Sequence, residues 1–166
     1  QHHTLARIEV AHGLRIVDIA NPHAMKEVAY FVPDVPQGSE RVQSNDVTVL
    51  DIRDLDRPAV LATVAVGKAP YGAALALGGR LLYVTNQHDD SVSVIDADTL
   101  KLQRTLSGFG YPEGIAAFGD KVYVVNWMDD ALSVLDARSG RLLATVPTGR
   151  NSRGFGDFVG HPVSAP

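Results

Sequence analysis

The stretch Leu82-Tyr83-Val84-Thr85-Asn86 returns 40 residues later as Val122-Tyr123-Val124-Val125-Asn126. Its flanks keep the same offset, because residues 90–97 return at 130–137. Weaker copies of the second half of this unit occur upstream, at 13–19 and 46–52. About one full unit is therefore duplicated, which is typical of repeat proteins in which each unit packs on its neighbours.

The alternation of residues inside each unit predicts strands rather than helices. Val92 and Val94 flank Ser93, which is the two-residue period of a strand with one buried face. Four short strands are predicted in the first complete unit, at 71–77, 81–86, 91–96 and 102–106, with turns at 78–79, 89–90 and 98–99. Because four strands in about 40 residues form a propeller blade, the sequence predicts an all-β fold. We expect a β-propeller of about four four-stranded blades, two complete and two degenerate, as a small ring or as part of a larger one.

The repeats divide the single predicted domain, residues 1–166, into units. Their approximate bounds are 4–33, 42–67, 70–108 and 111–149, and residues 150–160 are a candidate closing strand. An open arc of blades would expose apolar sheet faces at its ends. We therefore expect a protein partner or self-association to cover them.

Several of these segments resemble a known repeat family. Pro70-Tyr71-Gly72, Leu82–Asn86 and Ser91–Asp96 resemble the YVTN family of β-propeller repeats, and residues 13–22 are similar to the related LVIVD repeat. The resemblance implies an exported protein, periplasmic or extracellular, in a mature form without a signal peptide. It implies no particular ligand. YVTN propellers usually have about seven blades, so the chain supplies fewer than the family pattern.

Composition excludes several classes of protein. The formal net charge is −4 and the 15 Lys and Arg residues are scattered along the chain, which argues against nucleic acid as a partner. No segment approaches the ~20 apolar residues of a membrane span, so no membrane insertion is expected. The chain has no cysteine, which excludes disulfides and thiolate metal sites. No metal site and no cofactor are predicted.

Residues that recur in both complete units are interpreted as structural. Asn86 and Asn126 end the second strand, where an amide can cap a turn and tolerate a left-handed conformation. Asp96 and Asp136 end the third strand, where a carboxylate can accept backbone N–H groups of the next turn. A catalytic residue is needed once, whereas a folding device recurs in every blade.

Positions that differ between the units are the candidate ligand-binding residues. Gln87-His88 in one unit becomes Trp127-Met128 in the next. His88 is either a metal ligand or base, or a surface imidazole. Trp127 is either a stacking residue at the ring mouth or part of the packing between blades. Residues 149–156 form either a cradle for a carboxylate or phosphate or a plain connection between blades. The candidates are the inner-strand residues Tyr71, Tyr111 and Glu113, the loop residues His88 and Trp127, and Arg150, Asn151 and Arg153.

The sequence contains no Gly-x-Ser-x-Gly, His-Glu-x-x-His or Gly-x-Gly-x-x-Gly motif. No catalytic residues are predicted. We expect a non-enzymatic scaffold module that binds a protein partner or a small ligand. The alternative, based on similar propellers, is a propeller subunit of a quinoprotein or haem-type periplasmic oxidoreductase.

Overall fold

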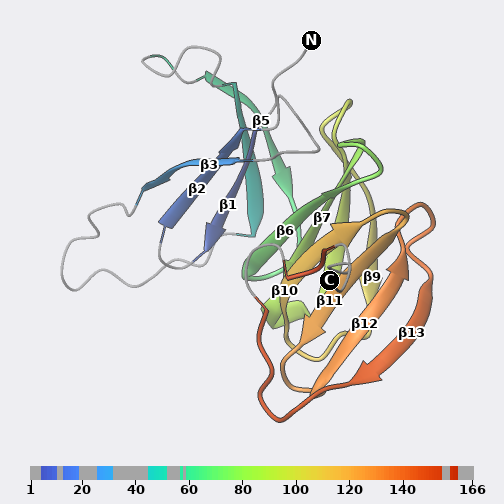
Figure 1. Cartoon of the computed structure of the whole chain (residues 1–166). Helices are drawn as coiled ribbons and strands as arrows, with labels where there is room; N and C mark the ends of the chain where they lie inside the picture. Colours follow the sequence, from blue (N-terminus) through green and yellow to red (C-terminus); the bar gives the residue numbers. More distant parts are fainter. Residues whose placement is uncertain are drawn as a thin grey trace, which may run out of the picture.

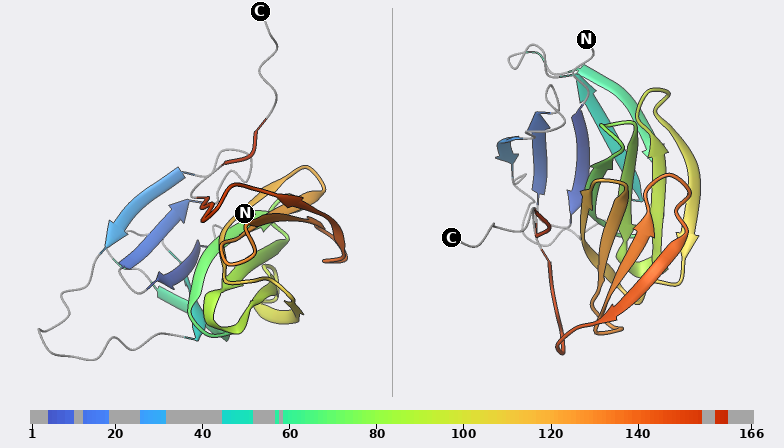
Figure 2. Two further views of the ribbon diagram at one scale, coloured as in Figure 1. Left: turned by 90° about the horizontal axis from the view of Figure 1, so that it is seen from below. Right: turned by 45° about the vertical axis from the view of Figure 1, so that its right-hand side comes forward.

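The computed structural model describes residues 5–10, 13–18, 26–31, 45–51, 57, 59–154 and 158–160. These residues form three antiparallel β-sheets that stand side by side (Figures 1 and 2). One short 3-10 turn, η1 (Gln87–Asp89), is the only helical element of the described ranges. The predicted all-β class is confirmed.

The two complete repeat units each form a four-stranded sheet with its strands in sequence order. Every strand predicted in the first unit is observed within one residue of its expected bounds, since the turns predicted between the strands are formed. The first sheet consists of β6 (Pro70–Ala76), β7 (Leu81–Asn86), β8 (Ser91–Asp96) and β9 (Lys101–Ser107). The second consists of β10 (Pro112–Phe118), β11 (Lys121–Asn126), β12 (Ala131–Asp136) and β13 (Leu142–Pro147).

The strands of the two degenerate units join in one five-stranded sheet instead of two separate blades. Its strand order is β3-β2-β1-β4-β5, and β1 pairs with β4 along residues 5–8 and 47–50. The strands are β1 (Leu5–Val10), β2 (Gly13–Asp18), β3 (Lys26–Phe31), β4 (Asp46–Asp51) and β5 (Ala59–Ala65). Much of the connecting chain of these units, including 32–44, lies outside the described residues.

The core lies between the sheets. On β7, alternate side chains point to opposite faces: Leu82 and Val84 pack with Val47 and Val49 of the five-stranded sheet, whereas Tyr83 packs toward β10–β13. The sheet β6–β9 is thus covered on both faces by its neighbours. This face-to-face stacking is the arrangement of propeller blades.

The end of the third strand carries the predicted carboxylate turn in both blades. Asp96 Oδ1 accepts backbone N–H groups of Asp98 at 3.1 Å and Thr99 at 2.7 Å. Asp136 Oδ1 does the same with Arg138 and Ser139 at 3.2 and 2.7 Å. The pKa of the Asp96 carboxyl is lowered chiefly by the Thr99 backbone N–H. The pKa of the Asp136 carboxyl is lowered chiefly by the Ser139 hydroxyl and then by the Ser139 backbone N–H, because such donors stabilise the charged form. The structural role predicted for these aspartates is confirmed.

The turn-capping role predicted for Asn86 and Asn126 is wrong. Asn86 has extended backbone, with φ −118°, and its side chain caps no backbone group. It is fully buried, and its Nδ2 donates to the Ser91 and Ser93 hydroxyls across the β7–β8 pair. Asn126 Nδ2 donates to Ser133 Oγ at 2.8 Å in the same way. In the turns that follow these asparagines, the left-handed residues are Asp90 and Asp130, at φ 49° and 48°.

Within the described part of the chain, one face of the last blade lacks the cover that its neighbour has. Tyr83, Val92 and Val94 are 0% exposed, because β10–β13 packs against them. Their counterparts 40 residues later, Tyr123, Leu132 and Val134, are only half-buried. The burial therefore alternates along β12, where every second residue faces away from the core.

Candidate functional site

The candidate site is built on the loops that enter the innermost strands. The residues Ala69, Tyr111 and Asn151 occupy equivalent positions in successive repeats, and all three are left-handed, with φ of 53°, 50° and 53°. Each turn aspartate holds the entry to the next repeat: Asp90 Oδ1 accepts the Tyr111 N–H at 2.9 Å, and Asp130 Oδ1 accepts the Asn151 N–H at 2.7 Å. Residues 149–154 therefore repeat the geometry with which β10 begins.

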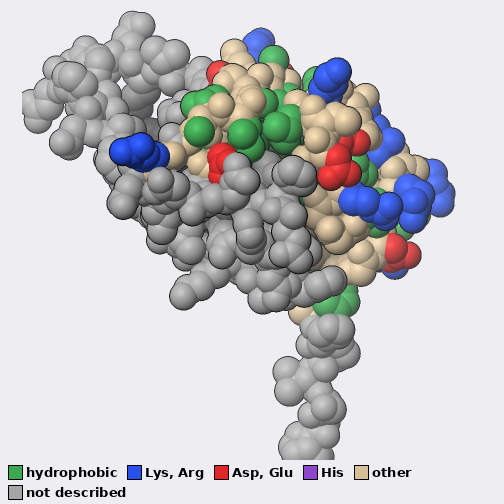
Figure 3. Space-filling model, turned by 90° about the horizontal axis from the view of Figure 1, so that it is seen from above, with side chains coloured by type: hydrophobic (Ala, Val, Ile, Leu, Met, Phe, Trp, Pro, Cys, Tyr) green, Lys and Arg blue, Asp and Glu red, His purple; other side chains and the backbone are tan. Residues whose placement is uncertain are grey.

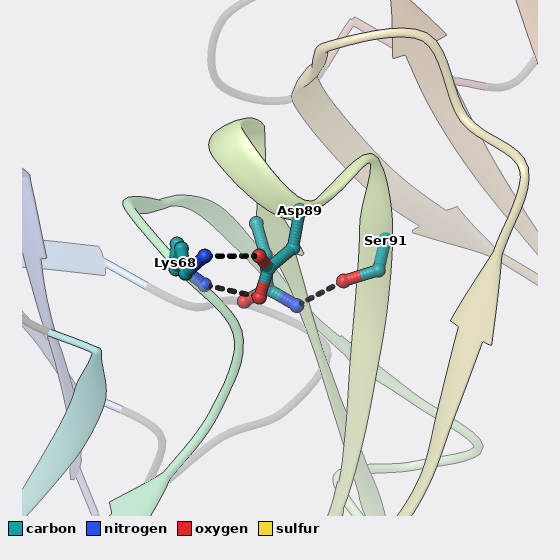
Figure 4. A network of polar contacts seen from close by, with 4 residues as sticks. Lys68, Asp89 and Ser91 are labelled. Atoms are coloured by element: carbon teal, nitrogen blue, oxygen red, sulfur yellow. Dashed lines mark hydrogen bonds and ion pairs between the residues drawn. The ribbon is translucent and has the colours of Figure 1, made fainter.

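The same carboxylate turns are tied back to their own blade. Asp89 Oδ2 accepts the Lys68 backbone N–H at 2.7 Å, and the Lys68 ammonium lies 3.8 Å from Asp89 Oδ1 (Figure 4). Asp129 Oδ2 accepts the Gly110 N–H at 2.8 Å. Asp89 and Asp90 in one blade, and Asp129 and Asp130 in the next, thus all accept hydrogen bonds from backbone N–H groups of loops. These bonds fix the loops that lead into the innermost strands.

Glycines let the innermost strands approach closely. A Cβ added to Gly72 would lie 2.5 Å from the Glu113 carbonyl oxygen, and one on Gly114 would lie 2.0 Å from the Gly154 carbonyl oxygen. Side chains larger than hydrogen do not fit at such contacts. The residues directly before Gly72, Gly114 and Gly154 are Tyr71, Glu113 and Arg153. These three residues occupy equivalent positions in successive repeats. Because Gly114 and Gly154 are in close contact, the residues before them, Glu113 and Arg153, also lie close together.

Glu113 is the buried acid of the site. Its side chain is 3% exposed, Oε1 accepts a 3.2 Å hydrogen bond from Gln87 Nε2, and Oε2 lies 3.7 Å from Arg153 Nε. Oε2 accepts no hydrogen bond from the part of the chain that the structure describes. Burial raises the pKa of the Glu113 carboxyl, and the charge of Arg153 and the Gln87 hydrogen bond oppose that rise.

Three rings stand beside this acid. The Trp127 and Tyr111 rings meet edge to face with centroids 5.2 Å apart, and the Tyr111 and His88 centroids are 5.6 Å apart. The Tyr111 hydroxyl and His88 Nε2 are within hydrogen-bond distance, at 3.2 Å. The Arg153 guanidinium lies 4.7 Å from the centroid of the Trp127 ring, a cation–π contact. The buried Trp127 Nε1 has no hydrogen-bond acceptor among the described residues.

The structure brings five of the predicted site residues into one network, namely His88, Tyr111, Glu113, Trp127 and Arg153. Tyr71 starts the inner strand of the neighbouring blade and is half-buried. Arg150 is exposed and takes no part in the network. Asn151 is exposed and contributes the backbone N–H bound by Asp130. Arg153 therefore belongs to the network, and Arg150 does not.

The sequence reasoning missed two buried members. Gln87 binds Glu113, as described above, and the Thr85 hydroxyl donates to the Glu113 carbonyl at 2.8 Å while it accepts the Gly72 N–H at 2.7 Å. The signal for Gln87 was present, because Gln87 and Trp127 occupy the same position in the two repeats and differ. Thr85 likewise becomes Val125 in the next repeat.

Metal binding and membrane spanning find no support in the described ranges. No group of three or more His, Asp or Glu side chains there is arranged to hold a metal ion. No helix in the same ranges has the length and apolar character needed to cross a bilayer.

Blades stacked around a common inner edge, with loops converging at one end, define a β-propeller. The chain is similar to hydrazine synthase of Kuenenia stuttgartiensis, with 29% identity and a TM-score of 0.58 over 64% of this chain and 30% of that chain. AztD of Citrobacter koseri has 14% identity and a TM-score of 0.55, covering 90% and 47%. The WD40 repeats of RRP9 have 8% identity and a TM-score of 0.58, covering 91% and 41%.

These likenesses show the fold: the chain is a set of β-propeller blades, as predicted. It spans between 30% and 47% of the length of these three structures. No family model matches the sequence, and no curated protein matches it. The resemblance to YVTN and LVIVD repeats therefore stays a prediction from the residues.

Proposed function

We propose that this chain is a non-enzymatic propeller module that binds a partner protein or a small ligand at the network of His88, Tyr111, Glu113, Trp127 and Arg153. The observation that carries the proposal is that two of the buried side-chain polar atoms without a hydrogen-bond partner among the described residues, Glu113 Oε2 and Trp127 Nε1, lie in one cluster. Buried polar groups are nearly always paired in folded proteins. Two orphans beside converging loops are typical of a site that a ligand completes.

The chemistry of the cluster favours binding over catalysis. The Glu113 carboxylate has an arginine as its nearest charged group and a glutamine as its hydrogen-bond donor. Neither is a nucleophile, and the imidazole of the network, His88, lies against the Tyr111 hydroxyl at 3.2 Å. Aromatic rings with one polar edge supply contact area at low conformational cost, as in many binding surfaces.

A panel of small molecules of different charge would test this function by thermal melting of the whole chain. A ligand present at 100 times its Kd stabilises the folded state by about 2.7 kcal/mol, which raises Tm by several degrees in a protein of this size. We expect Glu113→Gln combined with Trp127→Ala to abolish such shifts, and Met128→Ala, at a 66% exposed neighbour, to retain them. Equal shifts in both variants would contradict the proposed site.

The second candidate function is a propeller subunit of a quinoprotein or haem-type oxidoreductase. The observation that favours it is the 29% identity to a chain of hydrazine synthase. An ultraviolet–visible spectrum of the protein purified with its natural partners would distinguish the two functions. A haem or quinone chromophore would support the oxidoreductase, and a spectrum with protein absorption alone would support the binding module.

We further propose that the open face at Tyr123, Leu132 and Val134 is covered by another blade, from a partner or from a second copy of this chain. Its support is the contrast with Tyr83, Val92 and Val94, which are fully buried by a neighbouring blade. The resemblance to exported repeat proteins supports a periplasmic or extracellular location.

A further inference from the structure

Arg153 occupies the network in the way that a bound cation would. Its guanidinium lies over the Trp127 ring, and its Nε points to the buried Glu113 carboxylate at 3.7 Å. An aromatic face together with a desolvated carboxylate is the usual receptor for a guanidinium or ammonium group. The chain therefore fills this receptor with its own side chain.

The hold on Arg153 is weak. At 3.7 Å the contact with Glu113 is an ion pair without a hydrogen bond, and the Arg153 side chain is 47% exposed. The Arg153 end of the pair is open to water, which screens its charge and weakens the attraction. With Arg153 in place, Glu113 Oε2 and Trp127 Nε1 still have no hydrogen-bond partner in the part of the chain that the structure describes. A ligand that donates to Oε2 directly would make a better contact than Arg153 does.

The charges around the network also favour a cation. Among the described residues, the turn carboxylates Asp90, Asp129 and Asp130 accept backbone N–H groups, and these contacts do not neutralise their charges. With Glu113 they place four negative charges beside one network arginine. An anionic ligand would meet this field and the buried carboxylate, and both would repel it.

We propose that this site binds the guanidinium group of an arginine side chain on a partner polypeptide, and that Arg153 is an internal occupant that the partner's arginine displaces. The inference rests on the proposed function, since it names the ligand class of the same site. The site extends toward the surface through the rings of Tyr111 and His88. The Tyr111 ring contacts Trp127, and His88 is exposed to solvent.

The single tryptophan of the chain, Trp127, provides the readout. N-acetyl-arginine amide is titrated into wild type and Arg153→Ala while Trp127 fluorescence is recorded. We expect the variant, in which the receptor is vacated, to bind with a Kd about tenfold lower than wild type. Glu113→Gln should lose binding in either background. Arg141→Ala is the matched control, because Arg141 is exposed in the β12–β13 turn, and it should behave like wild type.

N-acetyl-citrulline amide has nearly the same shape without the charge and should not bind. If it binds as well as the arginine compound, or if Arg153→Ala binds no tighter than wild type, the inference is overturned. If Arg153→Ala folds poorly, Arg153→Gln keeps the aliphatic stem and is used in its place. At one concentration of methylguanidinium, a larger rise in the Tm of either variant than in the Tm of wild type gives a second measure of the same site.

Titration with compounds of opposite charge distinguishes a failure of the cation receptor from a failure of the proposed binding function. Binding of N-acetyl-glutamate amide instead of the arginine compound would overturn the cation receptor and leave a binding site at the network. No response of Trp127 to a compound of either charge, in wild type and in Arg153→Ala, would overturn both. An arginine-containing peptide that binds more tightly than methylguanidinium would support a polypeptide source for the cation.

Discussion

The hydroxyl of Tyr83 donates a 2.8 Å hydrogen bond to the backbone carbonyl of Ala137, 54 residues away in sequence. Tyr83 is fully buried on β7, and Ala137 directly follows β12. The bond therefore joins two blades. Its repeat counterpart, Tyr123, is half-buried on the uncovered face of the last blade.

Tyr83→Phe should lower the free energy of unfolding by about 1–2 kcal/mol, because it leaves a carbonyl at the blade interface without its donor. Tyr123→Phe is the matched control and should stay within about 0.5 kcal/mol of wild type, since its side chain is partly in water. Urea unfolding of both variants measures the difference. Equal losses would show that the Tyr83 hydroxyl adds nothing to blade docking.

Asn126→Ala should cost about 1–3 kcal/mol, because Asn126 is 1% exposed and its loss leaves the buried Ser133 hydroxyl without a donor. A double-mutant cycle with Ser133→Ala measures the pair, and we expect a coupling of at least about 0.5 kcal/mol. Additive effects would contradict the hydrogen bond. Binding at the network should be unchanged, because Asn126 contacts Ser133 and not the site residues.

The error over Asn86 and Asn126 shows where sequence reasoning stops. Both asparagines end a strand before an Asp-Asp turn, which is the usual context of a turn cap. The serines seven residues later decide otherwise, since Ser93 and Ser133 project on the same face of the sheet as the amides. Pairing register across strands is needed to see this, and a repeat pattern fixes strand bounds more readily than side-chain partners.

Glu113→Gln should change how stability depends on pH. Burial raises the pKa of Glu113 in the folded state above its unfolded value. In the pH window between these two pKa values, the native state binds more protons than the unfolded state. Wild type should therefore lose stability as pH rises from the unfolded pKa through the raised folded pKa. The glutamine variant lacks this loss and should be the more stable of the two above the window.

Unfolding free energies from urea titrations between about pH 4 and 8 test this. The two curves should meet at the acidic end, where Glu113 is protonated and resembles glutamine, and separate as pH rises. Arg153→Ala serves as a second comparison, because removing its charge removes an influence that lowers the pKa and should move the window to higher pH. If the free energy of unfolding of wild type rises relative to that of the glutamine variant as pH rises, the result would contradict a pKa raised by burial.

Gly114→Ala should release Arg153 from the network. Its Cβ would lie 2.0 Å from the Gly154 carbonyl oxygen, so the segment at 149–154 must move, and Arg153 with it. We expect a changed Trp127 emission as the guanidinium leaves the ring. Gly149→Ala is the control, because a Cβ there has no atom within 4 Å, and its emission should match wild type.

The site could be predicted in outline because function on repeat scaffolds lies where the copies differ. That rule selected His88 and Trp127, and the start of the inner strands selected Tyr111 and Glu113. It did not reveal that Arg153 turns inward while Arg150 stays exposed, since both lie in the same glycine-rich loop. The difference follows from the left-handed Asn151 and the close Gly114–Gly154 contact, which fix the direction of the chain.

Assembly gives the last prediction. Tyr123, Leu132 and Val134 correspond to residues that a neighbouring blade buries completely, and each hundred Å2 of apolar area left in water forgoes about 2.5 kcal/mol. Light scattering of the isolated chain should therefore report a species heavier than the 17.8 kDa monomer. Leu132→Lys combined with Val134→Lys should shift it to the monomer, whereas Leu102→Lys, at a 42% exposed position on another blade, should not.

A monomeric wild type would require cover from the chain itself. The entry at Asn151 is held by Asp130 as the entry to β10 is held by Asp90. If the chain covers its own face through this end, deletion of 151–159 should lower Tm sharply. If the wild type is a monomer and the deletion leaves Tm unchanged, neither a second chain nor the C-terminal segment covers the face. That result would contradict blade closure, because an uncovered apolar sheet face would then cost the fold nothing measurable.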